Sequence, residues 1–193
     1  MAREEIFMEI YSIFGHILEP PGPAFPDRVN ECIALLTPFR QEAADLMNRF
    51  KTFVEQTPLR RIEKIHDDTF GPEGACYPYV GYQLLGDGSH RRLFLDGLKE
   101  LYQNYGFSAA QETPDHLGVM LQFLADGGDE EELDDMVSLY VIPSLRRMLE
   151  GCEDRGTPYE EVLRALLLVL EERMTAQDGK VAPETAKESY LAK

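Results

Sequence analysis

The feature that most constrains the fold is an apolar repeat at three- and four-residue steps that runs through most of the chain. No stretch of any length alternates apolar and polar residues as a half-buried strand does. The sequence therefore predicts an all-α protein with a single compact multi-helix domain over residues 1–175. Residues 176–193 have little apolar content and are predicted to form a flexible tail of acidic and basic residues.

Prolines, glycines and caps divide this pattern into separate helices. Residues 20–23 (Pro-Pro-Gly-Pro) end the first helix, because consecutive prolines remove backbone donors. The expected helices cover residues 6–18, a segment after Pro26 capped by Asp27, a segment from Pro38 to Thr57, and residues 59–70. Further helices are expected from the cap Ser89 to Gly106, from Pro114 capped by Thr113 to Leu124, over residues 136–149 with a kink or restart at Pro143, and over residues 158–174.

The segment from residue 71 to residue 88 differs from the rest of the chain. Its glycines and prolines break the helical period, yet it is rich in tyrosine and leucine. Because loops are usually polar, such a composition indicates either a tightly packed loop or a ligand surface.

Charge and cysteine content limit the class of partner and the compartment. The 35 acidic and 19 basic residues give a formal net charge of -16, which repels nucleic acids and anionic lipids and attracts basic peptides. The three cysteines, Cys32, Cys76 and Cys152, show no C-x-x-C spacing and are expected to be free thiols. With no export signal at the N-terminus and no apolar run long enough for a bilayer, a cytoplasmic protein without membrane insertion is expected.

Residues 112–117 (Glu-Thr-Pro-Asp-His-Leu) contain the sharpest candidate site. The sequence places Asp115 and His116 in the first turn of a helix, where the positive end of the helix dipole favours the acid and lowers the basicity of the imidazole. The two residues can simply serve the helix start. They can also form an exposed acid–imidazole pair that accepts hydrogen bonds from a guanidinium or a peptide backbone.

A metal-dependent helical enzyme is the alternative from a different class. Glu63 and His66 have the Glu-x-x-His spacing of one half of a di-iron motif, and such an enzyme would also use Glu112, Asp115 and His116. No second copy of the motif is present, so a solvated helix face explains Glu63 and His66 better. The sequence therefore predicts no metal site, no cofactor and no catalytic residues.

The order of four motifs resembles the TorD/DmsD/NarJ family of redox-enzyme maturation chaperones, most closely its NarJ branch. The motifs are residues 62–70 ending in Asp-Asp-Thr-Phe, residues 77–82 (Tyr-Pro-Tyr-Val-Gly-Tyr), the helix from Arg91 to Tyr105, and residues 112–117. Each motif alone is weak, but the ordered set with these gaps is fairly specific.

The resemblance implies an all-helical chaperone, not an enzyme. Such chaperones bind the N-terminal segment, often a twin-arginine leader, of a molybdoenzyme catalytic subunit such as that of nitrate reductase. They hold that subunit in the cytoplasm until the molybdenum cofactor is inserted. By position, the resemblance assigns peptide binding to the residues of two motifs: Tyr77, Pro78, Tyr79, Tyr82, Glu112, Asp115 and His116.

The chain departs from the family pattern in two places. It contains no tryptophan, and Gly81 stands where many members carry serine. Both differences favour the NarJ branch, whose partner subunit keeps only a vestigial leader. A structural helical adaptor, with the aromatic segment in its core, is a further alternative. Both a monomer and a domain-swapped dimer are compatible with such a helical chain.

Overall fold

The computed structural model describes residues 3–74, 76–109, 112–153 and 155–178. Within these ranges the chain is helical, and its one β-type pairing is an isolated bridge between Tyr79 and His116. The all-α prediction is confirmed. The helices are α1 (Arg3–Ile17), α2 (Phe25–Leu36), α3 (Gln41–Gln56), α4 (Leu59–Phe70), α5 (Val80–Leu85), α6 (Ser89–Asn104), α7 (Leu117–Asp126), α8 (Glu130–Asp135), the π-helix η1 (Met136–Val141), α9 (Ile142–Glu153) and α10 (Tyr159–Asp178).

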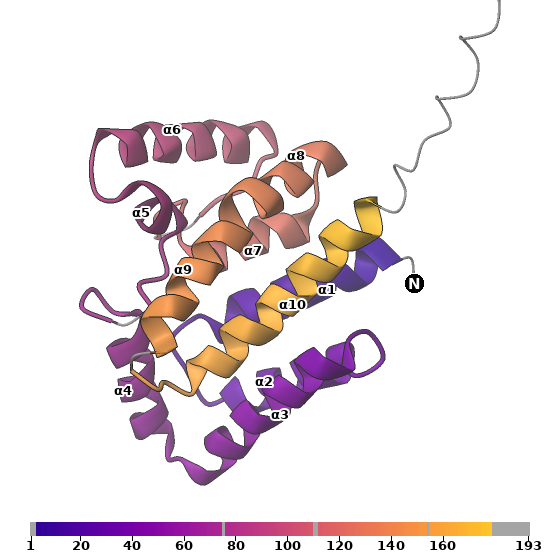
Figure 1. Ribbon diagram of the computed structural model, residues 1–193, viewed down its shortest axis with the longest axis vertical. Coiled ribbons are helices and arrows are strands. Elements are labelled where there is room, and N and C mark those ends of the chain that lie inside the picture. The colour runs from indigo at the N-terminus through magenta and orange to yellow at the C-terminus, as the bar shows by residue number, and fades with distance from the viewer. Residues whose placement is uncertain (1–2, 75, 110–111, 154, 179–193) are drawn as a thin grey trace, which may run out of the picture.

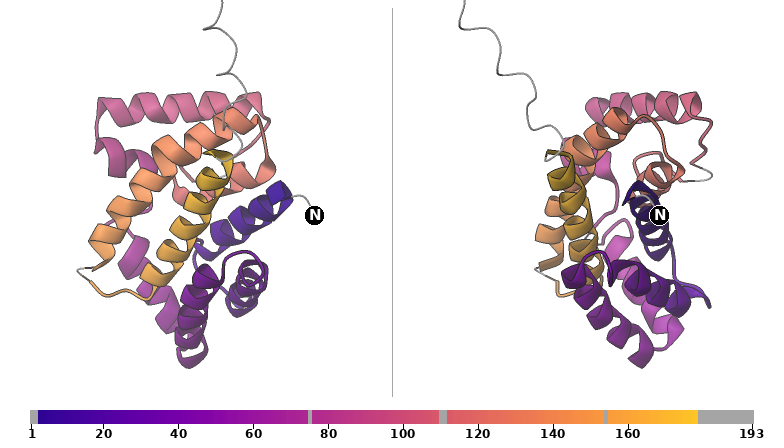
Figure 2. Two further views of the ribbon diagram at one scale, coloured as in Figure 1. Left: turned by 45° about the vertical axis from the view of Figure 1, so that its right-hand side comes forward. Right: turned by 90° about the vertical axis from the view of Figure 1, so that its right-hand side faces the viewer.

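Two helices organise the packing. Helix α1 packs against α7 and α2, and α10 packs against α3 and α9 (Figure 1). Helix α6 lies at one end of the molecule and α3 and α4 lie at the other, as two further views show (Figure 2). The core between them is strongly aromatic, and its fully buried side chains include Tyr11, Phe14, Phe50, Phe123 and Tyr159.

Helix starts differ from the predictions by one to three residues. Helix α2 begins at Phe25, so Asp27 lies in its first turn and is not the cap. Pro26 fits there because the first helical turn needs no donor from it. Ser89 is the first residue of α6 rather than its cap, which is Gly88. The glycine predicted to follow this helix is confirmed, since Gly106 has φ +69°.

Helix α5 was not predicted, because glycines and prolines interrupt the helical period on both sides of it. It spans six residues between Tyr79 and Gly86, and the latter has φ +69°. Val80 is buried, and α5 packs against α9, α6 and η1. The aromatic segment is thus partly a short helix that is anchored in the core.

The last third of the chain forms two long helical runs. The irregularity predicted at Pro143 takes the form of the π-helix η1, which ends two residues before this proline. Helix α10 begins directly after Pro158 and continues to Asp178, three residues into the predicted tail; residues 179–193 lie outside the described residues. In the part of the chain that the structure describes, no helix has the length and apolar character needed to cross a membrane.

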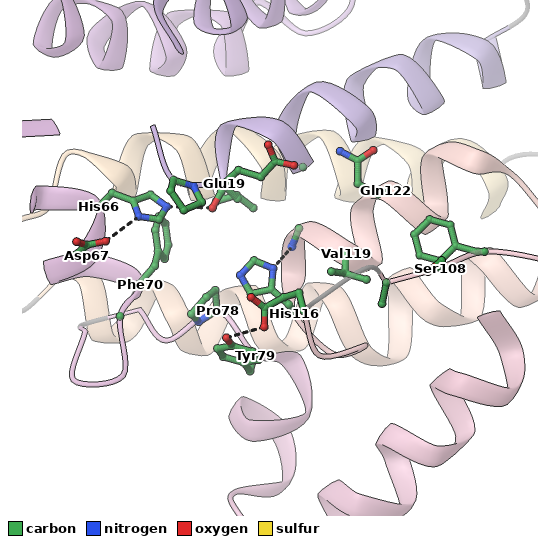
Figure 3. Close-up of a pocket in the computed structure, with 18 residues that line it drawn as sticks. Glu19, His66, Asp67, Phe70, Pro78, Tyr79, Ser108, His116, Val119 and Gln122 are labelled. Atoms are coloured by element: carbon green, nitrogen blue, oxygen red, sulfur yellow. Dashed lines mark hydrogen bonds and ion pairs between the residues drawn. The ribbon is translucent and has the colours of Figure 1, made fainter. Parts of the chain in front are cut away.

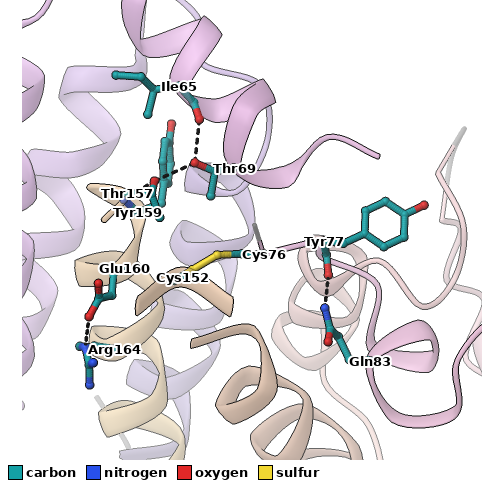
Figure 4. The surroundings of a disulfide bond; sticks show 10 residues. All are labelled: Ile65, Thr69, Cys76, Tyr77, Gln83, Cys152, Thr157, Tyr159, Glu160 and Arg164. Atoms are coloured by element: carbon teal, nitrogen blue, oxygen red, sulfur yellow. Dashed lines mark hydrogen bonds and ion pairs between the residues drawn. A yellow bond between two sulfur atoms is a disulfide. The ribbon is translucent and has the colours of Figure 1, made fainter. Parts of the chain in front are cut away.

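A disulfide joins the segment after α4 to the end of α9. Cys76 and Cys152 form this bond, with their Cα atoms 5.8 Å apart (Figure 4), and Cys32 is a buried free thiol. The expectation of three free thiols is therefore wrong. The two residues are 76 positions apart, so only the packing of α9 beside the α4–α5 connection brings them together.

Reduction of this disulfide should destabilise the protein. The bond closes a long loop in the unfolded chain, so its loss should lower the free energy of unfolding by about 2–4 kcal/mol. Urea unfolding with and without dithiothreitol measures the difference. The double variant Cys76→Ser/Cys152→Ser is the control, since reductant should not change its unfolding curve. Identical curves for the unmodified chain under both conditions would contradict the prediction.

Candidate functional site

Two of the sequence motifs lie side by side in the structure. The segment before α5 and the segment before α7 pair at Tyr79 and His116. The backbone N–H of Val80 donates to the carbonyl of Asp115 at 2.8 Å, and the N–H of Leu117 donates to the carbonyl of Pro78 at 2.8 Å. The two motifs therefore form one structural unit although 29 residues lie between them.

This pairing sets the start of α7. The prediction that Thr113 caps the helix and Pro114 opens it is wrong, because Pro114 and Asp115 form a turn, His116 is extended and the helix begins only at Leu117. His116 is the N-cap, and its Nδ1 accepts a hydrogen bond from the N–H of Gly118 at 3.2 Å. An imidazole nitrogen that accepts a backbone N–H carries no proton, so the cap favours the neutral ring with its proton on Nε2.

Asp115 is fully buried, with 0% of its surface exposed. Its carboxylate accepts from Arg91, with 2.9 Å between Nε and Oδ2 and 3.3 Å between Nη2 and Oδ1, and from the Thr113 hydroxyl at 3.0 Å. The hydrogen bond to Asp115 raises the pKa of the Arg91 guanidinium. The expectation of an exposed acid–imidazole pair is therefore wrong for Asp115, since its charge is already matched inside the chain.

Gly81 explains one departure from the family pattern. A Cβ atom on this residue would lie 2.8 Å from Oδ2 of Asp115, 2.8 Å from the ring of Phe94 and 3.2 Å from Cγ of Arg91. These separations are shorter than carbon contacts in proteins allow, so a serine would have to displace the ion pair. Glycine here lets the backbone of α5 approach the Asp115–Arg91 pair closely.

The tyrosines of the aromatic segment surround the Arg91 guanidinium. The ring of Tyr77 lies 4.4 Å from that of Tyr79 and 5.0 Å from that of Tyr82, measured between centroids. The guanidinium carbon of Arg91 lies 5.5 Å from the Tyr79 ring centroid and 5.9 Å from that of Tyr82. Such cation–π contacts fix the rings in place, and Tyr82 keeps 41% of its surface exposed.

A pocket of about 640 Å³ opens between the ends of α1 and α4 and the start of α7 (Figure 3). One wall comes from the two paired motifs, through Pro78, Tyr79, Glu112 and His116. The other residues come from α1, α4, the segment before residue 112 and α7: Gly15, Leu18, Glu19, Pro20, His66, Asp67, Phe70, Gly71, Phe107, Ser108, Ala109, Gly118, Val119 and Gln122.

The predicted site residues divide into three groups. Pro78, Tyr79, Glu112 and His116 line this pocket. Tyr77 and Tyr82 line a second, smaller and polar pocket together with Arg91. Asp115 lines neither pocket: it is buried and, through its ion pair with Arg91, holds the segment before α7 against α6.

Hydrogen bonding and burial set the protonation states of Tyr79 and His116 in the pocket wall. The Tyr79 hydroxyl donates to Oε1 of Glu112 at 3.1 Å, and burial together with this carboxylate raises the pKa of Tyr79 well above its usual range. Burial lowers the pKa of His116 against the opposing effect of nearby Glu112 and Asp115. The lowered basicity of His116 was predicted from the sequence, but its cause is burial and not the helix dipole.

The interpretation of Glu63 and His66 as a solvated helix face is wrong for His66, which is buried and lines the pocket. Glu63 is exposed, as that interpretation requires. Only 6% of the His66 surface is exposed, and its Nε2 lies 3.1 Å from the Leu18 carbonyl. Its Nδ1 is 3.7 Å from Oδ1 of Asp67. Among the described residues no group of three or more potential metal ligands occurs, so the five residues of the metal-enzyme alternative do not form one site.

Sequence reasoning missed Arg91 and the α1–α4 side of the pocket. A signal for His66 was present, because it follows Ile62 and precedes Phe70 by four residues each and so shares their buried helix face. For Arg91 and Glu19 no such periodic signal exists. Their positions depend on how the helices pack.

The family described as nitrate reductase delta subunit matches residues 36–176, most of the chain. The chain belongs to this family. The family comprises chaperones of the NarJ and TorD type, so the resemblance inferred from the motifs is confirmed. Membership implies a chaperone for molybdoenzyme maturation rather than a catalytic enzyme.

The fold is also similar to that of a solved structure. A candidate redox enzyme maturation protein from Archaeoglobus fulgidus superposes with a TM-score of 0.59 and 23% sequence identity, covering 85% of this chain and 93% of that chain. At this identity the likeness concerns the fold alone. A comparison with curated protein sequences finds no match.

The buried ion pair can be tested by a double-mutant cycle. Arg91→Ala should lower the free energy of unfolding by about 3–5 kcal/mol, because it leaves the Asp115 carboxylate buried without its cation. The double variant Arg91→Ala/Asp115→Ala should lose less than the sum of the single variants in urea unfolding. The exposed pair Arg49–Glu161, with 2.9 Å between charged atoms, is the control and should show a much smaller coupling. Additive effects of Arg91 and Asp115 would contradict this role.

The neutral state of His116 should appear in the pH dependence of stability. Because burial lowers its pKa in the folded chain, the unfolded chain takes up this proton at higher pH, near its ordinary pKa of about 6.5. The contribution to stability is thus fully present above about pH 6.5 and decreases as the pH falls below that value. The unfolding free energy should therefore fall less between about pH 7.5 and about pH 5.5 in His116→Asn, which keeps a capping acceptor, than in the unmodified chain. Equal decreases in the unfolding free energy of the two chains would contradict a lowered pKa for His116.

Proposed function

We propose that this chaperone binds the N-terminal segment of a molybdoenzyme catalytic subunit, of the nitrate reductase type, in the pocket between α1, α4 and α7. It holds the subunit in the cytoplasm until the molybdenum cofactor is inserted and the enzyme is assembled. The observation that carries the proposal is that a 640 Å³ pocket lies where two family motifs pair with each other.

The floor of the pocket suits the hydrophobic part of such a segment. Leu18, Phe70, Pro78, Phe107 and Val119 supply apolar surface from five separate parts of the chain. Burial of apolar side chains is the main source of affinity in peptide grooves. A volume of 640 Å³ accommodates a few side chains rather than a whole domain, which agrees with a short segment as the ligand.

The rim of the pocket suits the basic residues of the segment. Glu19, Asp67 and Glu112 lie on it, and the net charge of -16 attracts cationic peptides from a distance. We assign recognition of arginine to Glu112 and Asp67, because Arg28 already pairs with Glu19 and Arg91 neutralises the charge of Asp115. Asp115 is then a positioning residue, which holds Glu112 and His116 in place.

His116 supplies a directional contact. Its Nδ1 is occupied by the N–H of Gly118, which leaves the proton on Nε2 as a donor at the pocket wall. A peptide carbonyl is the natural acceptor for a neutral imidazole N–H. This donor role differs from the acceptor role that an exposed pair with Asp115 would give it.

Calorimetry with a synthetic peptide of the N-terminal residues of the host's nitrate reductase catalytic subunit tests the proposal. Glu112→Gln should weaken binding by about three- to tenfold and reduce its dependence on salt, because a charge-assisted hydrogen bond is lost. Tyr79→Phe, which loses only the hydroxyl bonded to Glu112, should have a smaller effect.

Matched controls separate the site from the overall charge. Glu150→Gln removes the same charge from an exposed position on α9 and should leave the affinity unchanged. A peptide with its arginines replaced by glutamine should bind the unmodified chain and Glu112→Gln alike. Absence of heat with the unaltered peptide, at low and high salt, would overturn the proposal and favour the structural adaptor.

A further inference from the structure

A separate groove lies between α6 and the α8–η1 run. It has a volume of about 390 Å³ and shares no lining residue with the pocket described above. Its floor is apolar or aromatic, and two carboxylates border it; the lining residues are Phe94, Gly97, Leu98, Leu101, Glu132, Asp135, Met136 and Tyr140. On α6 these residues follow at three- and four-residue steps, so one face of the helix forms one side of the groove.

Helix α6 leaves much of its apolar surface uncovered. Within this helix only Leu98 and Tyr102 are buried. Leu93 and Leu139, the chain neighbours of the lining residues Phe94 and Tyr140, are 71% and 57% exposed, and Tyr140 itself is 37% exposed. Contiguous exposed apolar side chains of this kind mark interaction surfaces.

Gly97 lies in the middle of this groove and has no structural reason within the chain. Glycine inside a helix costs about 1 kcal/mol relative to alanine. It is normally tolerated where another group approaches the backbone closely, yet nothing lies within 4 Å of the position that a Cβ atom of Gly97 would occupy. The space above this glycine is open in the isolated chain and available to a ligand.

The charge beside the groove is strongly acidic. Helix α8 has the sequence Glu-Glu-Glu-Leu-Asp-Asp and is capped by Asp129. Asp134 pairs with Arg173 at 2.7 Å on the side away from the groove, whereas Glu132 and Asp135 border it. Within the described part of the chain Asp135 makes no ion pair, so its charge is directed to what lies in the groove.

We propose that this groove binds a basic amphipathic α-helix of a partner polypeptide. The rings of Phe94 and Tyr140 meet across the groove, with 5.1 Å between their centroids, so a ligand lies along the groove over α6 and η1 rather than between them. An amphipathic helix binds a hydrophobic groove in this way, with its apolar face on the floor. The floor extends from Phe94 to Leu101, about two helical turns. The ligand therefore carries apolar residues at i, i+3 or i+4, and i+7, with lysine or arginine on the flank that faces α8.

A designed peptide serves as the probe. It is a helix of about 18 residues with leucine on one face and lysine on the other, and its affinity is measured by fluorescence anisotropy at several salt concentrations. A scrambled peptide of the same composition keeps the charge and loses the apolar face. We expect the designed peptide to bind at least about tenfold more tightly than the scrambled one, because a chain of this charge attracts both equally at long range.

Substitutions at Gly97 identify the groove as the binding site. Gly97→Leu fills the open space and should lower the affinity for the designed peptide at least about tenfold. Gly97→Ala adds only one methyl group and should lower this affinity much less. Both variants should unfold at the same temperature as the unmodified chain or higher, since both residues favour helix over glycine. A loss of binding therefore cannot come from a loss of folding.

The charge of the groove is tested separately. Asp135→Asn should lower the affinity about two- to fivefold and flatten its salt dependence, and Glu150→Gln on α9 should change neither. The N-terminal peptide of the catalytic subunit should bind Gly97→Leu as it binds the unmodified chain, so failure of this proposal is distinguishable from failure of the proposed function.

Three results would overturn the proposal. Equal affinity for the designed and scrambled peptides shows attraction by charge alone. Unchanged binding by Gly97→Leu places the contact elsewhere. A dimer in analytical ultracentrifugation that Gly97→Leu converts to a monomer makes a second copy of this chain the occupant of the groove.

Discussion

The buried ion pair between Asp115 and Arg91 is the contact on which the site depends. It joins the start of α6 to the segment before α7, and Gly81 allows α5 to pack directly against it. A buried pair of this kind contributes little net stability, because desolvation of both charges offsets their attraction. Its effect is geometric: Asp115 fixes the backbone that pairs with Val80, and Arg91 fixes the tyrosine rings.

The chemistry of the pocket wall follows from that arrangement. Burial keeps the neighbouring His116 neutral, although the carboxylates of Glu112 and Asp115 both act to raise its pKa. The paired segments also place the Tyr79 hydroxyl on Glu112. A motif that looks in sequence like an acid–imidazole pair is thus a neutral donor beside a surface carboxylate, with the second acid buried as a support.

Local patterns predicted much of the fold, and packing decided the rest. The apolar period located α1, α3, α4 and α10, because each presents one continuous face to the core. It failed at α5, whose six residues are too few to show a period between Tyr79 and Gly86. Four of the residues that the motifs indicated line the pocket, but Arg91 and the Cys76–Cys152 disulfide depend on contacts between distant segments that no local pattern encodes.

The two proposals together allow the pocket and the groove to bind different segments of one partner. They share no lining residue, so one polypeptide can occupy both at once without competition. Two weak contacts joined by a linker that spans them bind far more tightly than either alone, because the second contact forms at a high effective concentration. An assembly chaperone must also release its client. Division of the affinity between two sites allows this, since folding of the client can withdraw one contact and leave the other too weak to persist.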